Sequence, residues 1–467
     1  MPLLGGFEVR LSGSKRYTPR LENTLSYGVI RAPETVDMLR ISDCPLPLFV
    51  VLCLVLGVSS CGDSPSSGTD SSGANSASTD YGTEEQLREA FASAVSGTEI
   101  IIPPGRHKMS RSLVMNASNI TIRGSGSGRG EADSVLDFSD QVAGAEGMLL
   151  SGDDLTLKNF AIEDSIGDAL KISGGTNITI RGIRTEWTNG PATENGAYGI
   201  YPVQTENLLV EDSIAIGASD AGIYVGQSRK IVVRNNIARH NVAGIEIENS
   251  IDADVYDNLT EDNTGGILVF NMPDIPMTGE RTRVYENDVR NNNTENFAIP
   301  GTAVSGVPTG SGVMINSNDK VEVFNNRIGN NDTANIVIAS YFSANFAGQL
   351  EIAPGFDPYP ETLYIYDNSF TPGGAKPGRT ELDALRVALY GADGRLPDVI
   401  WDGAVNPELP PVEQQTTDKR ICMNNGSAIL LNVDLLNGAQ NPSTDMEAHN
   451  CELPKLAEVS FEEVDEH

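Results

Sequence analysis

The chain has 467 residues, and 64 Asp and Glu against 32 Lys and Arg give a formal net charge of −32 at pH 7. This charge argues against a nucleic-acid ligand, because phosphates select basic surfaces. It also disfavours direct attraction of a polyanionic sugar unless calcium or local basic residues mediate the contact. The 47 glycines and the 6% of aromatic residues suit many tight turns around a narrow aliphatic core.

The N-terminal region contains an apolar run, Pro45 to Val58, that is too short to cross a bilayer as a helix of about 20 residues. Arg40 precedes this run and small residues follow it, which indicates a secretory signal peptide. The segment LGVSSC resembles a bacterial lipoprotein signal, and the resemblance implies lipidation of Cys61. Because a signal peptide begins a chain, we interpret Met38 as the true start and residues 1–37 as a mis-assigned extension.

The remaining N-terminal segments and the cysteines fit an exported protein. Residues 38–60 form the predicted signal, and residues 61–80 are a low-complexity tether. Only Cys422 and Cys451 lie in the body of the mature chain, and two cysteines in an oxidising compartment predict one disulfide. We therefore expect a protein that is lipid-anchored in the bacterial cell envelope, at the outer membrane, with its membrane contact through the lipid on Cys61.

A helix is predicted directly after the tether. Thr83 and Gln86 have the spacing of a capping box, and Leu87, Phe91 and Val95 lie on one apolar stripe. We expect this helix to cover the open end of the fold that follows.

The central region repeats one phrase four times. GIYPVQ starts at Gly199, GIYVGQ at Gly222, GIEIEN at Gly244 and GILVFN at Gly266, so the starts are 23, 22 and 22 residues apart by subtraction. A period of about 20–50 residues indicates a solenoid. The apolar residues alternate as in a strand, and a second family of short strands lies between the phrases. Because no room is left for a crossover helix, residues 81–370 are predicted to form an all-β, right-handed parallel β-helix.

The phrases SDAGIYVGQS, NVAGIEIENS and GSGVMINSNDKVEVFNN resemble those of bacterial parallel β-helix repeat proteins with the pectin-lyase-like superfold. This resemblance implies a secreted or surface protein of a carbohydrate-active superfold. It implies no particular mechanism, because a fold alone does not define a function.

The third and fifth places of each phrase are predicted to face outward, with neighbouring coils about 4.8 Å apart. The third place holds Lys171, Tyr201, Tyr224, Glu246, Leu268 and Met314, and the fifth holds Ser173, Val203, Gly226, Glu248, Phe270 and Asn316. We expect Gly226 to leave a dent beside the tyrosines and Leu268 with Phe270 to form an apolar wall. This patch is predicted to bind a polysaccharide.

The same patch allows two kinds of chemistry. A uronate lyase or epimerase needs a base and a cation that stabilises the enolate. Tyr201 or Tyr224 could be the base, and Lys171, Arg229 or Arg184 could supply the positive charge.

A glycosidase would instead need two carboxylates across the scissile bond. Glu246 and Glu248 lie on one strand, and Asp220 lies at the turn before the neighbouring strand. Ordinary solvated side chains without a function are the third interpretation of this patch.

Several further residues are candidate ligand-binding groups. Gln204, Gln227 and Asn249 end successive phrases, and they could bind a ligand or stack from coil to coil. A second amide series is expected to be a structural ladder and consists of Asn236, Asn258, Asn287, Asn326 and Asn368. Trp187 could be a sugar platform or a lid over the coil below.

Residues 371–467 are predicted to be a C-terminal cap with a helix from Thr380 and an acidic end. For function the sequence leaves polysaccharide binding between Tyr201 and Glu248, lyase or epimerase activity, or a purely structural surface role. Calcium is the one candidate ion, and no histidine pair at metal-binding spacing accompanies the cysteines.

Overall fold

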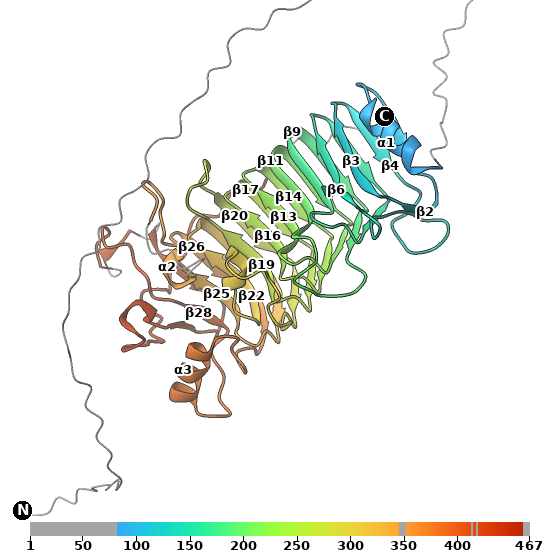
Figure 1. Cartoon of the computed structure of the whole chain (residues 1–467). Helices are drawn as coiled ribbons and strands as arrows, with labels where there is room; N and C mark the ends of the chain where they lie inside the picture. The colour runs from blue at the N-terminus through green and yellow to red at the C-terminus, as the bar shows by residue number, and fades with distance from the viewer. Residues whose placement is uncertain (1–81, 345–351, 412–413, 417–418, 461–467) are drawn as a thin grey trace, which may run out of the picture. The chain divides into compact units, whose positions relative to one another are not determined.

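The computed structural model describes residues 82–344, 352–411, 414–416 and 419–460 (Figure 1). The predicted extension, signal peptide and tether, with Cys61, and the acidic end at 461–467 lie outside the described residues. Within the described ranges, none of the helices has the length and apolar character needed to cross a membrane.

The first helix, α1 (Glu84–Ala92), has the predicted capping box. The Thr83 side chain accepts from the Gln86 amide, and the Gln86 side chain accepts from the Thr83 amide at 3.1 Å. Leu87 and Phe91 are buried against the first coil, where the Ser110 amide donates to Glu84 Oε1 at 3.0 Å. The predicted N-terminal capping helix is therefore confirmed, and Figure 1 shows it beside β3 and β4.

All strands of the described coils pair in parallel and form two sheets of 20 and 10 strands. The larger sheet holds β1 (Glu99–Ile101), β3 (Arg111–Asn116), β4 (Ile120–Arg123), β6 (Ala143–Ser151), β7 (Leu155–Lys158), β9 (Leu170–Arg181), β11 (Tyr198–Glu211), β13 (Ala221–Gly226), β14 (Arg229–Arg234), β16 (Ala243–Glu248), β17 (Ile251–Tyr256), β19 (Gly265–Phe270), β20 (Glu280–Tyr285), β22 (Ser311–Asn316), β23 (Asp319–Phe324), β25 (Ala334–Ala339), β26 (Leu363–Tyr366), β28 (Val399–Trp401), β29 (Ile421–Asn424) and β30 (Leu430–Asn432).

The smaller sheet holds β2 (Gly105–Lys108), β5 (Ser134–Asp137), β8 (Ala161–Glu163), β10 (Arg184–Glu186), β12 (Ile214–Ile216), β15 (Ile237–Arg239), β18 (Leu259–Glu261), β21 (Asp288–Arg290), β24 (Arg327–Gly329) and β27 (Ser369–Thr371). The short helices are η1 (Ala303–Gly306), α2 (Tyr341–Ala344) and η5 (Leu435–Asn437), and the longer C-terminal one is α3 (Thr380–Tyr390).

The repeated phrases stack in register. Ile223 of β13 pairs with Ile200 of β11 and with Ile245 of β16. These three side chains are fully buried, as are their successors at the same place in each later coil. The alternation of the sequence therefore sets one inward aliphatic column, and the predicted parallel β-helix is confirmed.

Asparagine ladders join the coils at two turns. In the predicted ladder, Asn236 Nδ2 donates to Asn258 Oδ1 at 3.0 Å, and the same bond recurs through the predicted members as far as Asn425. A second ladder, which we did not predict, runs through Asn241, Asn263, Asn292 and Asn331. Both ladders satisfy the amides and carbonyls that a buried turn would otherwise leave unpaired.

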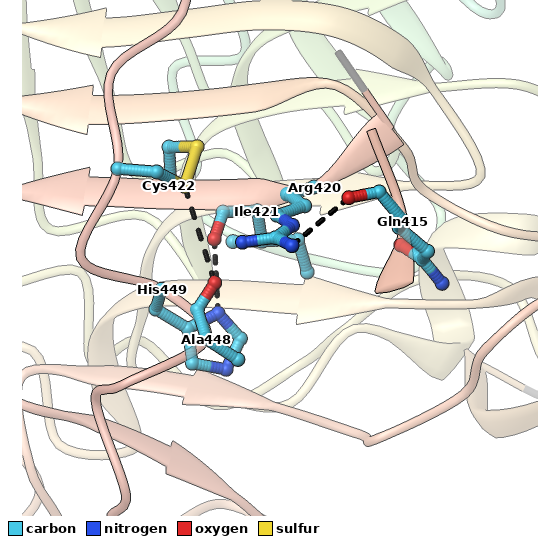
Figure 2. Close-up of a disulfide and its surroundings, with 7 residues drawn as sticks. Gln415, Arg420, Ile421, Cys422, Ala448 and His449 are labelled. Atoms are coloured by element: carbon cyan, nitrogen blue, oxygen red, sulfur yellow. Dashed lines mark hydrogen bonds between the residues drawn. A yellow bond between two sulfur atoms is a disulfide. The ribbon is translucent and has the colours of Figure 1, made fainter. Parts of the chain in front are cut away.

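The parallel sheet continues beyond residue 370, where the repeat ends in the sequence. Strand β28 pairs with β25 and β29 pairs with β26, so the C-terminal region adds strands as well as loops. Helix α3 begins at Thr380, as predicted. Cys422 on β29 forms the predicted disulfide with Cys451, and Figure 2 shows the His449 ring nearby, with Nδ1 2.9 Å from the Ile421 carbonyl oxygen.

The last described residues run back along a stack of aromatic rings. Tyr285 stacks on Tyr256 at 4.8 Å and on Phe324 at 4.9 Å between ring centroids. The Leu456 amide donates to Glu322 Oε1, and the Val459 amide donates to Asp254 Oδ2, each at 3.1 Å. The chain end thereby covers the outer face of these coils.

Candidate functional site

The register places the predicted site residues on neighbouring coils. Tyr201 lies beside Lys171, Tyr224 lies beside Glu246, and Gly226 lies beside Glu248. We call the outer surface formed by Tyr198, Tyr201, Tyr224, Asp220, Glu246 and Glu248 the tyrosine–carboxylate face.

Three tyrosine rings pack together on this face. The Tyr198 centroid lies 4.4 Å from that of Tyr201 and 4.6 Å from that of Tyr224, and Tyr201 meets Tyr224 edge to face at 5.0 Å. We did not predict Tyr198, although it directly precedes the repeated glycine at position 199. Its hydroxyl lies near Asp220 and opposes part of the rise in the pKa of that carboxyl group.

The carboxyl groups of the face are crowded and mostly buried. Tyr224 Oη donates to Glu248 Oε1 at 2.8 Å. Glu246 is 1% exposed, and its Oε2 has no hydrogen-bond partner among the described residues. Burial and the neighbouring charges of Asp220 and Glu248 raise the pKa of Glu246 well above its usual value. Burial and Glu248 raise the pKa of Asp220 from 3.8 to about 8. Asp220 is therefore mainly protonated at neutral pH.

The pKa values of the tyrosine hydroxyls are raised, so these groups stay protonated and cannot accept a proton as a catalytic base must. Burial and the charge of Asp168 raise the pKa of Tyr201 to about 12, and burial and Glu248 raise the pKa of Tyr224 further. A base acts best when its pKa lies near the working pH. The structure therefore does not favour the predicted role of Tyr201 or Tyr224 as a base.

Lys171 contacts the Tyr201 ring, with Nζ 4.7 Å from the centroid. The same atom lies 4.0 Å from Glu146 Oε1 and 3.9 Å from Asp168 Oδ2. Burial raises the pKa of Asp168 to about 6 despite the nearby lysine. The charge of Lys171 is shared between two carboxyl groups of the protein, which reduces what it could supply to an enolate.

Two predicted features of this face are wrong. A Cβ atom on Gly226 would lie 2.4 Å from the Tyr224 ring, so that ring fills the expected dent. Leu268 and Phe270 are fully buried and pack in one apolar cluster with Val304 of η1. The insertion after β21 thus covers the expected apolar wall and closes this end of the face.

An open recess of about 420 Å³ lies at the turn where the phrases end. We call it the amide recess, and it is lined by Asp153, Gly175, Thr176, Gln204, Thr205, Glu206, Gln227, Arg229, Pro276 and Met277. Gln204 Nε2 donates to Gln227 Oε1 at 3.2 Å. Arg229 is exposed and forms no ion pair with a described residue.

Asn249, the third predicted amide, has a structural role beside the recess. Its Nδ2 donates to the carbonyl oxygens of Met272 at 3.0 Å and Met277 at 2.7 Å. These bonds hold the insertion that contributes Met277 to the recess wall, so Asn249 positions the recess without lining it.

Two other predicted site residues lie in the body of the protein. Trp187 is 5% exposed, packs in the main core and donates from Nε1 to the Ser165 carbonyl oxygen at 2.8 Å. A buried ring cannot offer its face to a sugar, so the platform prediction for Trp187 is wrong. Arg184 is also buried, on the smaller sheet, where it pairs with Glu163 at 2.6 Å and with Glu186. Arg184 therefore cannot supply the positive charge that we expected it to provide for an enolate on the outer face.

Comparison with known families identifies the repeated region. Residues 114–279 match a family model described as "Right handed beta helix region". The fold is a right-handed parallel β-helix. None of the curated proteins matches the chain.

Several solved β-helix structures are similar to this one. The A-module of mannuronan C-5 epimerase AlgE4 from Azotobacter vinelandii is 14% identical, with a TM-score of 0.46, over 63% of this chain and 85% of that one. Endopolygalacturonase I from Stereum purpureum is 12% identical, with a TM-score of 0.38, over 62% and 96%. An alginate lyase from Paenibacillus sp. is 14% identical, with a TM-score of 0.31, over 62% and 94%. At these values the likeness concerns the β-helix and says nothing about a substrate.

Proposed function

We propose that this β-helix protein binds a glycan in the amide recess, with Tyr201 at the edge of the binding surface. The observation that carries the proposal is the recess itself. Its volume of about 420 Å³ lies within the roughly 300–1,000 Å³ typical of small-molecule sites. Its walls supply two glutamine amides and one arginine whose hydrogen bonds suit sugar hydroxyls and carboxylates.

Tyr201 lies on the same strand as Gln204, which lines the recess. Tyr201 precedes Gln204 by three residues in β11, and its ring is half-buried, so part of it remains open to solvent. An aromatic edge next to hydrogen-bonding amides suits a sugar ring, which has apolar and polar surfaces.

The positive charge of Arg229 should favour acidic sugars over neutral ones. It is a local basic group in a chain of net charge −32, and it forms no ion pair with a described residue. An arginine with free donors binds a carboxylate by charge-assisted hydrogen bonds. We therefore expect an acidic oligosaccharide to bind more tightly than a neutral one of equal length.

Binding without bond cleavage is the function that the geometry supports best. The tyrosine hydroxyls have raised pKa values, and the amide recess contains Arg229 but neither Tyr201 nor Tyr224. Lys171 lies beside Tyr201, but its charge is shared with Glu146 and Asp168, so a free cation and a base are not gathered around one substrate atom, as a lyase or epimerase requires.

The expected result for Arg229→Ala is about tenfold weaker binding of uronate oligosaccharides, which corresponds to roughly 1.4 kcal/mol for one charge-assisted contact. Isothermal titration calorimetry with uronate and neutral oligosaccharides measures this change. Neutral oligosaccharides should bind Arg229→Ala and the unchanged protein alike. Arg327→Ala, which removes an exposed arginine side chain on the smaller sheet, is the control.

Equal uronate binding by Arg229→Ala and Arg327→Ala would contradict the proposal. The absorbance of unsaturated products should stay flat when uronate polymers are incubated with the protein, with or without calcium. A rise would instead favour the lyase hypothesis. No binding of any glycan would leave the structural surface role as the better account.

We also propose that the protein is exported and anchored by a lipid on Cys61, as its N-terminal sequence predicts. Cells that express the chain from Met38 and are fed a labelled fatty acid should incorporate the label into the protein. Cys61→Ser should abolish that incorporation and release the protein from the detergent-soluble membrane fraction. Label that persists in Cys61→Ser would show that the lipid is elsewhere or that the signal prediction is wrong.

A further inference from the structure

A cluster of carboxylates lies away from both surfaces described above, where the segment 352–362 meets the start of β23. Asp319 begins β23, and Asp357 and Glu361 come from that segment. The Glu361 amide donates to Asp319 Oδ1 at 2.8 Å, and the Lys320 amide donates to the Glu361 carbonyl oxygen at 3.2 Å. The cluster therefore sits at a junction between two parts of the chain.

The spacing of these carboxylates suits one metal ion. One oxygen from each of Asp319, Asp357 and Glu361 lies within 4.8 Å of the others. Calcium binds oxygen at about 2.3–2.6 Å, so two ligands of one calcium ion lie up to about 5 Å apart. Within the described ranges this is the one group of acidic, histidine or cysteine side chains with such spacing.

Glu361 provides an independent indication of a ligand. The residue is 5% exposed, and Lys419 Nζ contacts its Oε2 at 3.1 Å. Its Oε1 is buried and has no hydrogen-bond partner among the described residues. A buried carboxylate oxygen without a partner is costly, and a carboxylate that belongs to an acidic cluster is well placed to coordinate a cation.

The charge around the cluster is not balanced by the protein. Three carboxylates face one nearby ammonium group, that of Lys419. At this spacing the three carboxylates repel one another. A divalent cation would remove this repulsion.

We propose that Asp319, Asp357 and Glu361 form a calcium site that fastens the segment 352–362 to β23. An all-oxygen ligand set favours calcium over softer transition metals. The fastened segment also contacts the neighbouring coils, because Ser317 Oγ donates to the Pro358 carbonyl oxygen at 2.8 Å and Phe356 meets the Tyr341 ring at 5.4 Å. Calcium should therefore stabilise this end of the β-helix.

Terbium luminescence tests the site directly, because terbium replaces calcium and is excited through a nearby tyrosine. Tyr359 lies between Asp357 and Glu361 and donates its amide to Asp357 Oδ1 at 3.0 Å. The folded protein should give saturable terbium emission that calcium displaces. Calcium at 5 mM should also raise the melting temperature by about 2–5 °C.

Asp357→Asn and Glu361→Gln should each abolish the emission and the calcium-dependent rise in melting temperature. Asp357→Asn keeps the oxygen that accepts from Tyr359, so this variant should remain folded. The matched controls are Asp252→Asn, which alters a surface ion pair with Arg281, and Glu248→Gln on the tyrosine–carboxylate face.

Both controls should behave as the unchanged protein does. The proposal is overturned if emission persists in Asp357→Asn and Glu361→Gln, or if calcium neither displaces terbium nor raises the melting temperature. Loss of emission in Glu248→Gln alone would also overturn it, because the ion would then lie on the tyrosine–carboxylate face.

Discussion

Replacing Asp220 by asparagine is expected to stabilise the protein at pH 8 by about 5 kcal/mol and to leave its stability at pH 4 nearly unchanged. Burial and Glu248 raise the pKa of Asp220 from 3.8 to about 8. Between these two values the folded protein holds a proton that the unfolded chain has released. The free energy of unfolding therefore falls as the pH rises from about 4 to about 8.

Asparagine removes this dependence, because it mimics the protonated carboxyl group and does not titrate. Glu246→Gln should act in the same direction, since burial, Asp220 and Glu248 raise the pKa of Glu246. Urea unfolding at pH 4, 6 and 8 measures both effects. Asp257→Asn, at an exposed turn residue with a φ of 53°, is the control and should follow the unchanged protein.

A stability of Asp220→Asn that falls with pH as steeply as in the unchanged protein would contradict this account. If the prediction holds, the protein maintains a destabilising group of carboxyls beside half-buried Tyr201 at neutral pH. Natural proteins retain such groups mainly where they serve a function, because selection otherwise has easy stabilising substitutions. The result would therefore add weight to a binding role for the surface between this face and the amide recess.

The sequence predicts the fold and much of the site because both follow from the repeat. A phrase of fixed length that stacks on its own copy places Tyr224 beside Glu246 and Gly226 beside Glu248 without further information. Gln204 and Gln227 also meet as their shared place in the phrase indicates.

The errors arise where a side chain or a loop leaves the repeat. The repeat does not predict the position of Val304 of η1. This residue packs with Leu268 and Phe270, which we expected to form an open apolar wall. It also does not reveal that Trp187 turns into the core, because its loop lies outside the repeated phrases. The raised pKa values could not be predicted either, since they depend on how deeply each group is buried.

The second large effect is expected in the asparagine ladder, where Asn258→Ala should lower the free energy of unfolding by about 4 kcal/mol. Asn258 is 2% exposed, and its Oδ1 accepts from the amide and the side chain of Asn236, both at 3.0 Å. Its Nδ2 donates to the Val233 carbonyl oxygen at 2.9 Å and to Asn287 Oδ1 at 3.0 Å. Alanine would remove all four bonds and leave the buried Asn236 amide without its acceptor, although Asn287 Oδ1 keeps the Asn258 amide and Asn236 Nδ2 keeps the Val210 carbonyl oxygen.

The size of the decrease in the free energy of unfolding shows whether the asparagines stabilise the coils as a connected ladder or each turn is stable by itself. A single neutral hydrogen bond contributes only about 1 kcal/mol, but each buried group left unpaired costs about 1–3 kcal/mol. Urea unfolding of Asn258→Ala measures the loss, and Asn189→Ala, at an exposed loop position, should change stability by less than about 0.5 kcal/mol. A loss of 1 kcal/mol or less in Asn258→Ala would mean that water or a backbone shift satisfies the orphaned groups. The coils would then depend on their aliphatic core and strand pairing, and the ladder would add little to their stability.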